Sequence, residues 1–556
     1  MKFSKKPLSQ IVTQLCLAKG IDHIIISPGS RNAPLTIGFT ENTNFTNFSI
    51  VDERCAAFFA LGIAQQLKKP VALVCTSGSA LLNYYPAIAE AYYSDIPLVI
   101  ISADRPEELI NIGDGQTIMQ EDVFSNHILF SANCKEGTID KETNEIKINT
   151  ALNTCIKQQG PVHINIPFSE PLYETVSKLE FQPTNIPVEI SQTKTNFSED
   201  LSVFQKQWNN AKKKMILVGV LPPDSLEQQF LDELSKDESV IILTETTSNL
   251  YHDSIFPSID QLIAPLDSDG FESLQPEILL TLGGMIVSKK IKAFLRTYSP
   301  EIHWHVDSKK AYDTYFCLKH HFKSTPDDFF SVFLQKNMAI KSSYQKDWQK
   351  LKEYRLERHK QYEANISFSD FKVFSEISKE LPKDIQLQLS NSATIRYAQL
   401  FKIDKSIEVF CNRGTSGIDG CTSTAIGAAY ASKKPIIFIT GELSFLYDSN
   451  AFWNNYIPAN FKIIVINNGG GGIFRILPGD KNTDNFSTYF ETKHQLTAAH
   501  LCTMHNLEYS SVKKEGDLQS ALTTFFKNSN GPSLLEIFTP SKINDTVLLD
   551  YFRYLK

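Results

Sequence analysis

The chain has 556 residues, of which 42% are hydrophobic and 21% charged, with a formal net charge of -7. This composition is typical of a globular protein of about three domains, and the negative charge argues against a nucleic-acid or anionic-membrane partner. No stretch approaches the roughly 18 uninterrupted apolar residues of a membrane span, and the N-terminal segment has an amphipathic-helix pattern instead of a signal-peptide core. The nine scattered cysteines lack a Cys-x-x-Cys motif, which indicates reduced, buried thiols in a cytoplasmic protein.

Short apolar runs rich in β-branched residues recur along the chain, separated by segments of helix length. Continuous apolar strands that alternate with helices indicate parallel sheets covered on both faces. The runs fall into three sets, so we predict an α/β protein with three doubly wound parallel-sheet domains, spanning residues 1–180, 195–340 and 365–556. The predicted strands are 23–27, 71–75, 97–102, 162–166, 215–220, 240–244, 277–282, 302–306, 385–389, 407–410, 435–439, 461–466 and 533–538.

Two linkers divide these sets. Residues 169–195 are rich in Pro, Glu and Thr and lack strong periodicity, whereas residues 341–364 are dense in Lys, Glu, Gln and Tyr. We expect the second linker to form an exposed helix with many charges, and we favour a solvated face over a partner-binding one.

Two glycine-containing segments stand directly after predicted strands of the third set. Gly441-Glu442-Leu443-Ser444 follows the run 435–440, and Asn467-Asn468 with four glycines follows 461–466. The spacing is that of a βαβ unit, so both segments end strands at one edge of a sheet. A carboxylate, an amide oxygen and a carbonyl suit Mg²⁺, and glycine N–H groups suit phosphate. We predict a diphosphate–Mg²⁺ site; the alternative is a glycine-rich turn without a ligand.

Four arginines stand just past predicted strands: Arg31, Arg105, Arg396 and Arg413. Ligands of open α/β sheets bind outside the carboxyl ends of the strands, and guanidinium is the preferred bidentate partner of carboxylate. Four such groups in an acidic protein indicate a substrate with more than one carboxylate. For any single arginine, the alternative is a structural ion pair.

The paired segments resemble the thiamine-diphosphate motif, which the family writes as Gly-Asp-Gly, then about 25 to 30 residues, then Asn-Asn. Carried over, Glu442, the Asn468 side chain and the Gly470 carbonyl would bind Mg²⁺. Glu442 departs from the usual Asp by one methylene, so either the loop sits back slightly or metal affinity suffers. Gly113-Asp114-Gly115 spells the same tripeptide, but it closes no apolar strand and no Asn-Asn pair follows, so we interpret it as a loop before Gln116.

Glu53 is the second key carboxylate, placed before the helical segment that begins at Cys55. Taken alone, an acid in the first turn of a helix complements the helix dipole. In thiamine enzymes, however, a glutamate of the N-terminal domain, often from the partner subunit, bonds the aminopyrimidine and favours its imino tautomer. A buried acid with a tuned pKa is the expected device.

Further stretches resemble one family in particular, the 2-succinyl-5-enolpyruvyl-6-hydroxy-3-cyclohexene-1-carboxylate synthases of menaquinone biosynthesis. The resemblance covers essentially the whole chain, and its most specific segments are 27–31 and 412–420; others are 52–54, 76–80, 103–109, 160–168 and 447–451. It implies decarboxylation of 2-oxoglutarate and 1,4-addition of the succinyl unit to isochorismate, with thiamine diphosphate and Mg²⁺ or Mn²⁺. It also implies a homodimer, or a dimer of dimers, with shared active sites.

The site residues of the family carry over to matching positions. Those at the reaction centre are Glu53, Gln116 and Arg31. The cofactor contacts are Glu53, Ser392, Ile418, Gly441, Ser444, Asn468, Gly470 and Ile473. The substrate contacts are Ser30, Arg31, Arg105, Gln116, Lys289, Lys290, Ser392, Arg396, Arg413 and Phe474. The metal ligands are Glu442, Asn468 and Gly470. Lys290 replaces an arginine and offers a point charge instead of a fork. For Ile418, Ile473 and Phe474 the alternative is plain core packing.

Two rival functions stay open at this point. Another thiamine-dependent carboligase or 2-oxoacid decarboxylase would share Glu53 and the metal motif but would not need the four arginines. A non-catalytic homologue with an impaired metal site has Glu442 as its support. A nicotinamide-binding oxidoreductase is weaker, because no Gly-x-Gly-x-x-Gly follows an early strand.

Overall fold

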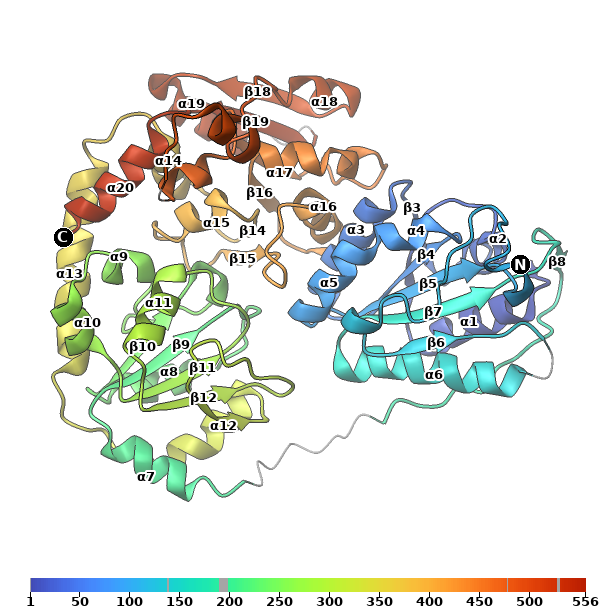
Figure 1. Cartoon of the computed structure of the whole chain (residues 1–556), viewed down its shortest axis with the longest axis horizontal. Helices are drawn as coiled ribbons and strands as arrows, with labels where there is room; N and C mark the ends of the chain where they lie inside the picture. Colours follow the sequence, from blue (N-terminus) through green and yellow to red (C-terminus); the bar gives the residue numbers. More distant parts are fainter. Residues whose placement is uncertain (1, 138–139, 190–198, 478, 528–530) are drawn as a thin grey trace.

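Three parallel sheets with helices packed around them form the protein (Figure 1). The structure is a computed structural model that describes residues 2–137, 140–189, 199–477, 479–527 and 531–556. Each sheet is made from one of the three predicted sets of strands, which confirms the predicted fold class. No helix in these ranges is long and apolar enough to cross a membrane.

The first sheet is six-stranded, in the order β3-β2-β4-β5-β7-β6. Its strands are β2 (His23–Ile26), β3 (Thr46–Ser49), β4 (Val71–Cys75), β5 (Leu98–Asp104), β6 (Ser131–Asn133) and β7 (Val162–Pro167). Its helices are α1 (Pro7–Ala18), α2 (Ala33–Thr40), α3 (Glu53–Leu67), α4 (Ser79–Asn83), α5 (Tyr85–Ser94) and α6 (Lys141–Gln158). A separate antiparallel pair joins β1 (Phe3–Ser4) to β8 (Thr175–Val176), which lies in the first predicted linker. Residues 190–195 of that linker lie outside the described residues.

The middle sheet is five-stranded, in the order β10-β9-β11-β12-β13. Its strands are β9 (Lys214–Val218), β10 (Val240–Thr244), β11 (Ile278–Leu282), β12 (Ile302–Val306) and β13 (Leu318–Phe322). Its helices are α7 (Ser202–Asn210), α8 (Gln228–Ser235), α9 (Ile259–Ile263), α10 (Ser268–Leu274), α11 (Lys289–Thr297) and α12 (Pro326–Phe333).

The third sheet is again six-stranded, in the order β15-β14-β16-β17-β19-β18. Its strands are β14 (Gln386–Leu389), β15 (Glu408–Cys411), β16 (Ile436–Gly441), β17 (Lys462–Asn467), β18 (Glu508–Val512) and β19 (Ser533–Phe538). Its helices are α14 (Asp370–Glu380), α15 (Ala393–Ala398), α16 (Cys421–Ala431), α17 (Glu442–Tyr447), α18 (Ala499–Met504), α19 (Glu515–Lys527) and α20 (Asn544–Tyr554).

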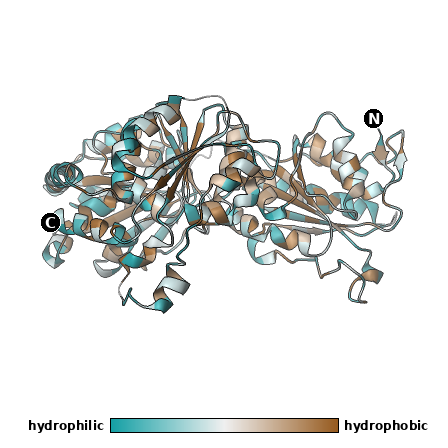
Figure 2. Cartoon of the chain, turned by 90° about the horizontal axis from the view of Figure 1, so that it is seen from above, coloured by the Kyte–Doolittle hydropathy of each residue, from teal (hydrophilic) through white to brown (hydrophobic). Residues whose placement is uncertain are grey.

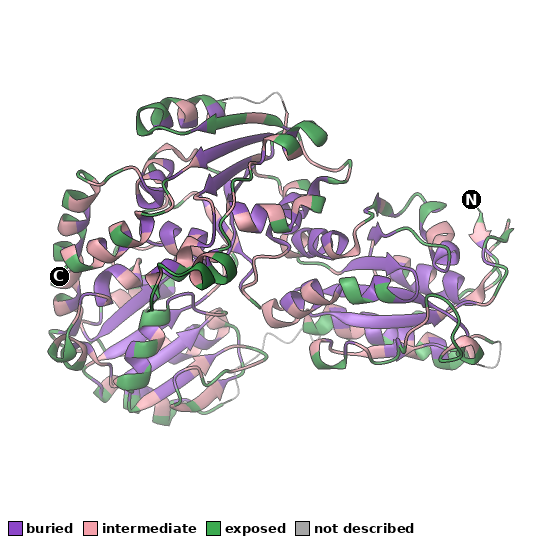
Figure 3. Cartoon of the chain, turned by 45° about the horizontal axis from the view of Figure 1, so that its top comes forward, coloured by how far each residue is buried: buried purple, intermediate pink, exposed green. Residues whose placement is uncertain are grey.

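The strands in the middle of each sheet are largely apolar because both faces of the sheet are buried there (Figures 2 and 3). In β4, Leu73 packs into one core while Ala72 and Val74 pack into the core on the opposite face. Successive side chains of a strand point to opposite sides, so a charged residue in a strand with helices on both sides is buried and needs a partner, as Lys214 of β9 has in Asp237 at 2.7 Å. This is why continuous apolar runs identified the strands in the middle of each sheet.

Helices α3 and α16 join the first and third domains through a shared core. They cross at two glycines: a Cβ on Gly62 would lie 2.1 Å from the Thr424 carbonyl oxygen, and one on Gly427 would lie 2.0 Å from that of Phe59. A side chain at either position would therefore force the two backbones apart. The crossing fixes the first sheet against the third.

The second predicted linker forms the long helix α13 (Tyr344–Glu363), but it is not exposed all round as expected. Tyr344 and Trp348 are buried in the core of the middle domain. About three turns after Trp348, Arg358 donates to the Tyr554 carbonyl and His359 bonds the Tyr551 hydroxyl of α20. The helix thus has a buried stripe, and it connects the middle domain to the third.

Candidate active site

The predicted metal motif is assembled at the carboxyl ends of two neighbouring strands. β16 and β17 pair in parallel, so Glu442 after β16 and Asn468 after β17 lie at the same sheet edge. The Glu442 carboxylate is only 3% exposed, and its Oε1 accepts the Gly470 N–H at 2.8 Å. The longer side chain of glutamate thus reaches the glycine loop. These oxygen donors fit a hard cation, although the described residues hold no cluster of three His, Cys, Asp or Glu for a metal.

Two neighbours of this motif carried no sequence signal. Asp370, at the start of α14, accepts from Asn468 Nδ2 at 2.9 Å and from the Thr539 hydroxyl at 2.6 Å. This bond turns the Asn468 amide so that its oxygen faces away from Asp370. Burial raises the pKa of Asp370 to about 6. His494 pairs with Glu442 at 3.4 Å, and that carboxylate raises the pKa of the imidazole.

The expected cofactor contacts surround the same strand ends. Gly441 closes β16, and Ser444 in α17 donates to the Ile418 carbonyl at 2.7 Å. Ile473 and Phe474 lie in a short 3-10 helix after the glycine loop, with Ile473 half-buried. Phe474 is 38% exposed, so the alternative of plain core packing is wrong for it. An apolar side chain exposed beside the glycine loop is available to a ligand or a second chain.

Glu53 begins α3, whose N-terminus is capped by Asp52: the Asp52 carboxylate accepts the N–H groups of Arg54 and Cys55. Glu53 itself accepts from Asn83 Nδ2 at 3.1 Å. It is half-buried in this chain, and its burial against a cofactor and a partner subunit stays a prediction. Its hydrogen-bond partner Asn83 is exposed.

The third domain holds this end of α3 in place. Asn450 donates to the Asp52 carboxylate at 2.8 Å, and Arg54 donates to the Tyr447 carbonyl at 3.0 Å. The segments 52–54 and 447–451, which share the family resemblance, therefore contact one another. Their contact fixes the position of Glu53 without touching its carboxylate.

Arg31 and Arg105 are brought together in the first domain, at the ends of β2 and β5. Burial and then the charge of Arg105 lower the pKa of Arg31. Arg105 donates to Ser77 Oγ and to the Gly115 carbonyl, with Asp114 3.4 Å from its Nε. The segment 113–115 is a loop, as predicted. Ser30 and Gln116 are exposed beside these arginines on the same loops.

Arg396 and Arg413 form a second pair, at the ends of β14 and β15. Burial and then the charge of Arg413 lower the pKa of Arg396. Arg396 bonds the carbonyl of Ser392, whose backbone has φ +67° and ψ −123°, a sparsely populated conformation for a residue with a side chain. Arg413 donates to Asn391 Oδ1 at 2.7 Å.

Lys289 and Lys290 begin α11 and are exposed. The Lys290 ammonium lies 4.9 Å from the centre of the Phe552 ring in α20. Burial raises the pKa of Asp260, and the charges of Lys290 and Arg396 oppose that rise. Asp260, which belongs to no motif in the sequence, therefore lies near both Lys290 and Arg396.

The four arginines differ in whether a carboxylate lies within ion-pair distance, which is the alternative of a structural ion pair. Arg31 lies 3.2 Å from Glu170 and Arg105 lies 3.4 Å from Asp114, both with exposed acids. Among the described residues, neither Arg396 nor Arg413 is within ion-pair distance of a carboxylate. In the same part of the chain, the buried Nε atoms of Arg31 and Arg413 have no hydrogen-bond partner. A buried donor without a partner is costly, and a ligand carboxylate would satisfy it.

The site residues thus fall into two groups. One lies on the first domain (Ser30, Arg31, Glu53, Arg105 and Gln116). The other lies on the middle and third domains (Lys289, Lys290, Ser392, Arg396, Arg413, Ile418, Gly441, Glu442, Ser444, Asn468, Gly470, Ile473 and Phe474). Across the described ranges, no hydrogen bond or ion pair joins a side chain of one group to a side chain of the other.

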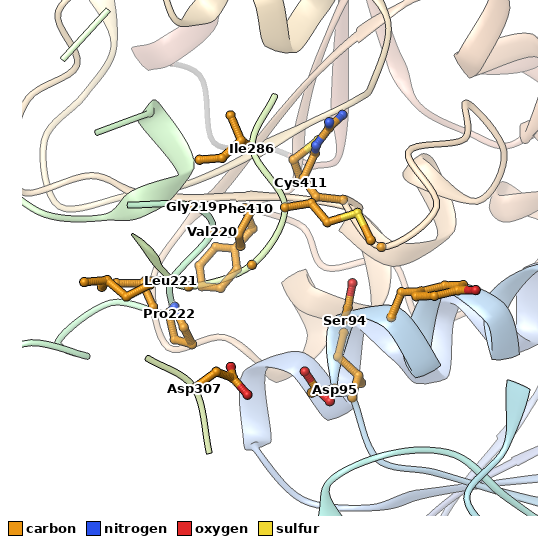
Figure 4. A pocket seen from close by; sticks show the side chains of 18 of the residues that line it. Ser94, Asp95, Gly219, Val220, Leu221, Pro222, Ile286, Asp307, Phe410 and Cys411 are labelled. Carbon is orange, nitrogen blue, oxygen red and sulfur yellow. The ribbon is translucent and has the colours of Figure 1, made fainter. Parts of the chain in front are cut away.

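A large cavity lies elsewhere, where the three domains meet (Figure 4). It holds about 700 Å³ and is lined by Ser94 of α5 and the following Asp95, by segments at the ends of β9, β11 and β12, and by Phe410 and Cys411 of β15. Of the predicted site residues in the described chain, Arg413 alone lines it. Size is only a default indication of a binding site, so we place the candidate site at the strand ends that carry the chemistry.

Comparisons with known proteins identify the class of protein to which the chain belongs. Residues 7–128 match the model "Thiamine pyrophosphate enzyme, N-terminal TPP binding domain", and residues 189–389 match "Middle domain of thiamine pyrophosphate". The chain therefore belongs to the class of thiamine diphosphate enzymes.

Full-length relatives narrow the class to a family. The chain is 56% identical to a 2-succinyl-5-enolpyruvyl-6-hydroxy-3-cyclohexene-1-carboxylate synthase of Christiangramia forsetii and 57% identical to one of Flavobacterium psychrophilum. A synthase of the same name from Porphyromonas gingivalis is 36% identical. The matches cover 100% of this chain and 98% to 100% of each relative. The chain therefore belongs to the 2-succinyl-5-enolpyruvyl-6-hydroxy-3-cyclohexene-1-carboxylate synthase family.

Proposed function

We propose that the protein decarboxylates 2-oxoglutarate and adds the succinyl unit to isochorismate in a 1,4 sense, as a step of menaquinone biosynthesis. The observation that carries the proposal is the pair Arg396 and Arg413, one half-buried and one buried guanidinium group, neither with a carboxylate partner in the described chain. Both proposed substrates are dicarboxylates. The full-length likeness to synthases of that name supports the same reaction.

The proposed mechanism assigns separate tasks to the two groups of residues. Bound thiamine diphosphate supplies a nucleophilic carbon and an electron sink for decarboxylation. Glu53, oriented by the capped end of α3, would share a proton with the aminopyrimidine N1′ and so set its tautomer. Arg31, Arg105, Arg396 and Arg413 would bind and orient the substrate carboxylates. Gln116 and Ser30, on exposed loops next to the first pair, would complete the substrate contacts.

We infer that Glu442, the Asn468 side chain and the Gly470 carbonyl would hold Mg²⁺ or Mn²⁺, which would supply positive charge for the diphosphate of the cofactor. The support is the burial of Glu442 and its contact with the glycine loop. Asp370 would act behind the ligands, because it orients the Asn468 amide. Ser444, Ile418 and Ile473 would contact the cofactor from the same strand ends, and Ser392 and Phe474 would line the substrate side together with Lys289 and Lys290.

We infer a homodimer, or a dimer of dimers, in which a second copy brings the two groups together. Glu53 is only half-buried in one chain, and large apolar side chains are exposed near both groups: Leu82, Ile112 and Met119 on the first domain, and Phe474, Leu477, Phe490 and Leu496 on the third. Exposed apolar groups of this size commonly mark protein interfaces.

The described cysteines are all free and mostly buried, with Cys317 half-buried, which supports the expected cytoplasmic location.

Carbon dioxide release tests the function. The purified protein is given 2-oxoglutarate, thiamine diphosphate and Mg²⁺, with and without isochorismate, while isochorismate is followed by its absorbance. Consumption of both substrates together supports the proposal. Consumption of 2-oxoglutarate alone favours the rival decarboxylase. If a folded protein consumes neither substrate, Glu442→Asp is the next variant, because recovery of activity would trace the failure to the metal site.

A further inference from the structure

Glu90 of α5 is a buried acid that the proposed reaction does not use. Its side chain is 1% exposed and belongs to the first domain, yet most of its hydrogen bonds reach the third. Oε1 accepts the Gly414 N–H at 2.7 Å, and Oε2 accepts the Thr415 N–H at 2.6 Å and the Thr415 hydroxyl at 2.8 Å. The fourth bond comes from Ser94 Oγ within α5, at 2.8 Å.

These four hydrogen bonds stabilise the buried carboxylate of Glu90. Within the described residues, Glu90 has no ion-pair partner. A buried charge without a counter-ion depends on its hydrogen bonds, and a carboxylate that accepts backbone N–H groups binds them more strongly than a neutral acceptor does. The loop around Gly414 is therefore fixed to α5.

Gly414 allows the contact to be this close. A Cβ at this position would lie 2.6 Å from the Glu90 carbonyl oxygen, 2.7 Å from Ser94 Oγ and 3.0 Å from Glu90 Oε1. A larger residue would move the loop off α5. The two domains thus meet directly beside Arg413.

The other side of the same loop is held within the third domain. Asn391 donates to the carbonyls of Asn412 and Gly417 at 2.6 and 2.7 Å, and its oxygen accepts from Arg413. The loop from residue 412 to 417 is therefore fixed from both sides, by Asn391 and by Glu90. The Arg413 guanidinium, which is 9% exposed, has little room to adjust.

We propose that Glu90 is a positioning residue that sets Arg413 for a substrate carboxylate, so that the junction between the first and third domains contributes to substrate binding. This inference rests on the proposed function for the role of Arg413. Glu90 itself touches neither the cofactor contacts nor the substrate contacts assigned above.

The test is Glu90→Gln, which keeps the shape but presents an NH₂ group to one of the two N–H donors. In the dimeric holoenzyme we expect KM for at least one dicarboxylate to rise about tenfold, with kcat changed by less than about threefold. Binding of thiamine diphosphate should be unchanged. Gln66→Ala is the matched control, because Gln66 accepts from Gln386 at 2.7 Å across the same junction without contacting the loop; its KM should stay at the wild-type value.

A double-mutant cycle separates positioning from general destabilisation. If Glu90 acts through Arg413, adding Glu90→Gln to Arg413→Ala should raise KM no further, because residues that act through each other are not additive. Additive effects, or a wild-type KM in a folded Glu90→Gln, overturn the proposal. If that variant does not fold, Thr415→Val removes one donor to Glu90 and should raise KM about two- to threefold; an unchanged KM there also overturns it.

Failure of the proposed function is recognised separately. If the wild type consumes neither substrate, the binding of 2-oxoglutarate is measured by calorimetry in the same variants. Weaker binding in Glu90→Gln, with no further loss in the Arg413→Ala background, then still supports the positioning role. Equal binding by wild type and Glu90→Gln overturns it.

Discussion

The first and third sheets have the same topology but carry different chemistry. If the strands of each domain are numbered in chain order, both sheets run 2-1-3-4-6-5. After the second strand, the first domain places Glu53 and the third places Arg413; after the third strand, the first has Thr76 and Ser77 where the third has Glu442. The fold provides the positions at the carboxyl ends of the strands, and the residues at those positions decide the chemistry.

The comparison extends to the helices. α3 and α16 each follow the second strand of their domain, and they cross one another at Gly62 and Gly427. Equivalent helices therefore pack against each other across the junction. The first and third domains are therefore built alike and differ at their loops.

The largest effect is expected for Glu53 of the first domain. We expect Glu53→Gln to lower kcat by about 10²- to 10⁴-fold, because a general acid–base group is lost, while the unfolding midpoint and the affinity for thiamine diphosphate stay near wild type. Single-turnover decarboxylation of 2-oxoglutarate measures the loss of rate. Calorimetry measures the unfolding midpoint and the affinity for thiamine diphosphate. Unchanged turnover would remove Glu53 from the mechanism.

Arg396→Ala should act on the substrate side alone. Loss of a charged hydrogen-bonding group predicts a rise in KM for a dicarboxylate of about 10- to 100-fold, with little change in cofactor affinity. Steady-state kinetics with each substrate varied in turn gives the values. Arg553→Ala, at a side chain 75% exposed on α20, is the control. Equal KM values in wild type and Arg396→Ala would return Arg396 to a structural role.

Gly427→Ala tests the crossing of the equivalent helices. Its methyl group would meet the Phe59 carbonyl oxygen at 2.0 Å, so we expect the free energy of unfolding to fall by about 1–3 kcal/mol. Urea denaturation followed by circular dichroism measures the loss. Gly516→Ala is the control, since nothing lies within 4 Å of its Cβ position and alanine favours a helix. A stability equal to that of wild type would contradict the tight crossing.

A smaller effect is expected for Asp370, which accepts a hydrogen bond from Asn468 of the metal motif. Asp370→Asn weakens the hold on the Asn468 amide, and loss of such an outer partner lowers metal affinity by about 10- to 100-fold. The Mg²⁺ concentration needed for half-maximal binding of thiamine diphosphate reports this shift, independently of turnover. If that concentration does not change, Asn468 is oriented by other means.

The smallest effect concerns pH at the domain junction. Asp448 is fully buried and accepts from Ser423, and burial raises its pKa to about 6. Since the folded state then binds more protons than the unfolded state between about pH 4 and pH 6, this group contributes stability that is lost as pH rises through 6. Urea denaturation at several pH values should therefore show wild type losing stability relative to Asp448→Asn over that window. A constant difference would contradict the raised pKa.

The strands in the middle of each sheet could be predicted, but four edge strands could not be placed from apolar runs. β3, β6, β13 and β18 are half-exposed, so their sequences alternate or are polar. An edge strand has one open side and needs no continuous apolar run. The helix α13 was predicted, but its buried stripe was not, because only a few of its positions are apolar.

The same contrast holds for the site. Glu442, Asn468 and the arginines could be chosen because each directly follows an apolar run, and parallel strands bring their carboxyl ends together. Asp370, His494 and Glu90 lie in segments far away in sequence, with no motif of their own. Only the folded chain brings them to the motif, to Glu442 and to the Arg413 loop. The domain limits and the roles of the site residues stay predictions.

The contact between the first and middle domains differs in kind from the other two junctions. Asp95 pairs with Lys309 at 3.1 Å and with Lys310 at 3.0 Å, and all three side chains are about one-third exposed. Ion pairs of this exposure are screened by salt, whereas a shared apolar core and a buried helix stripe are not. Ionic strength should therefore act selectively on this molecule, loosening the middle domain from the first while the third domain stays attached to both.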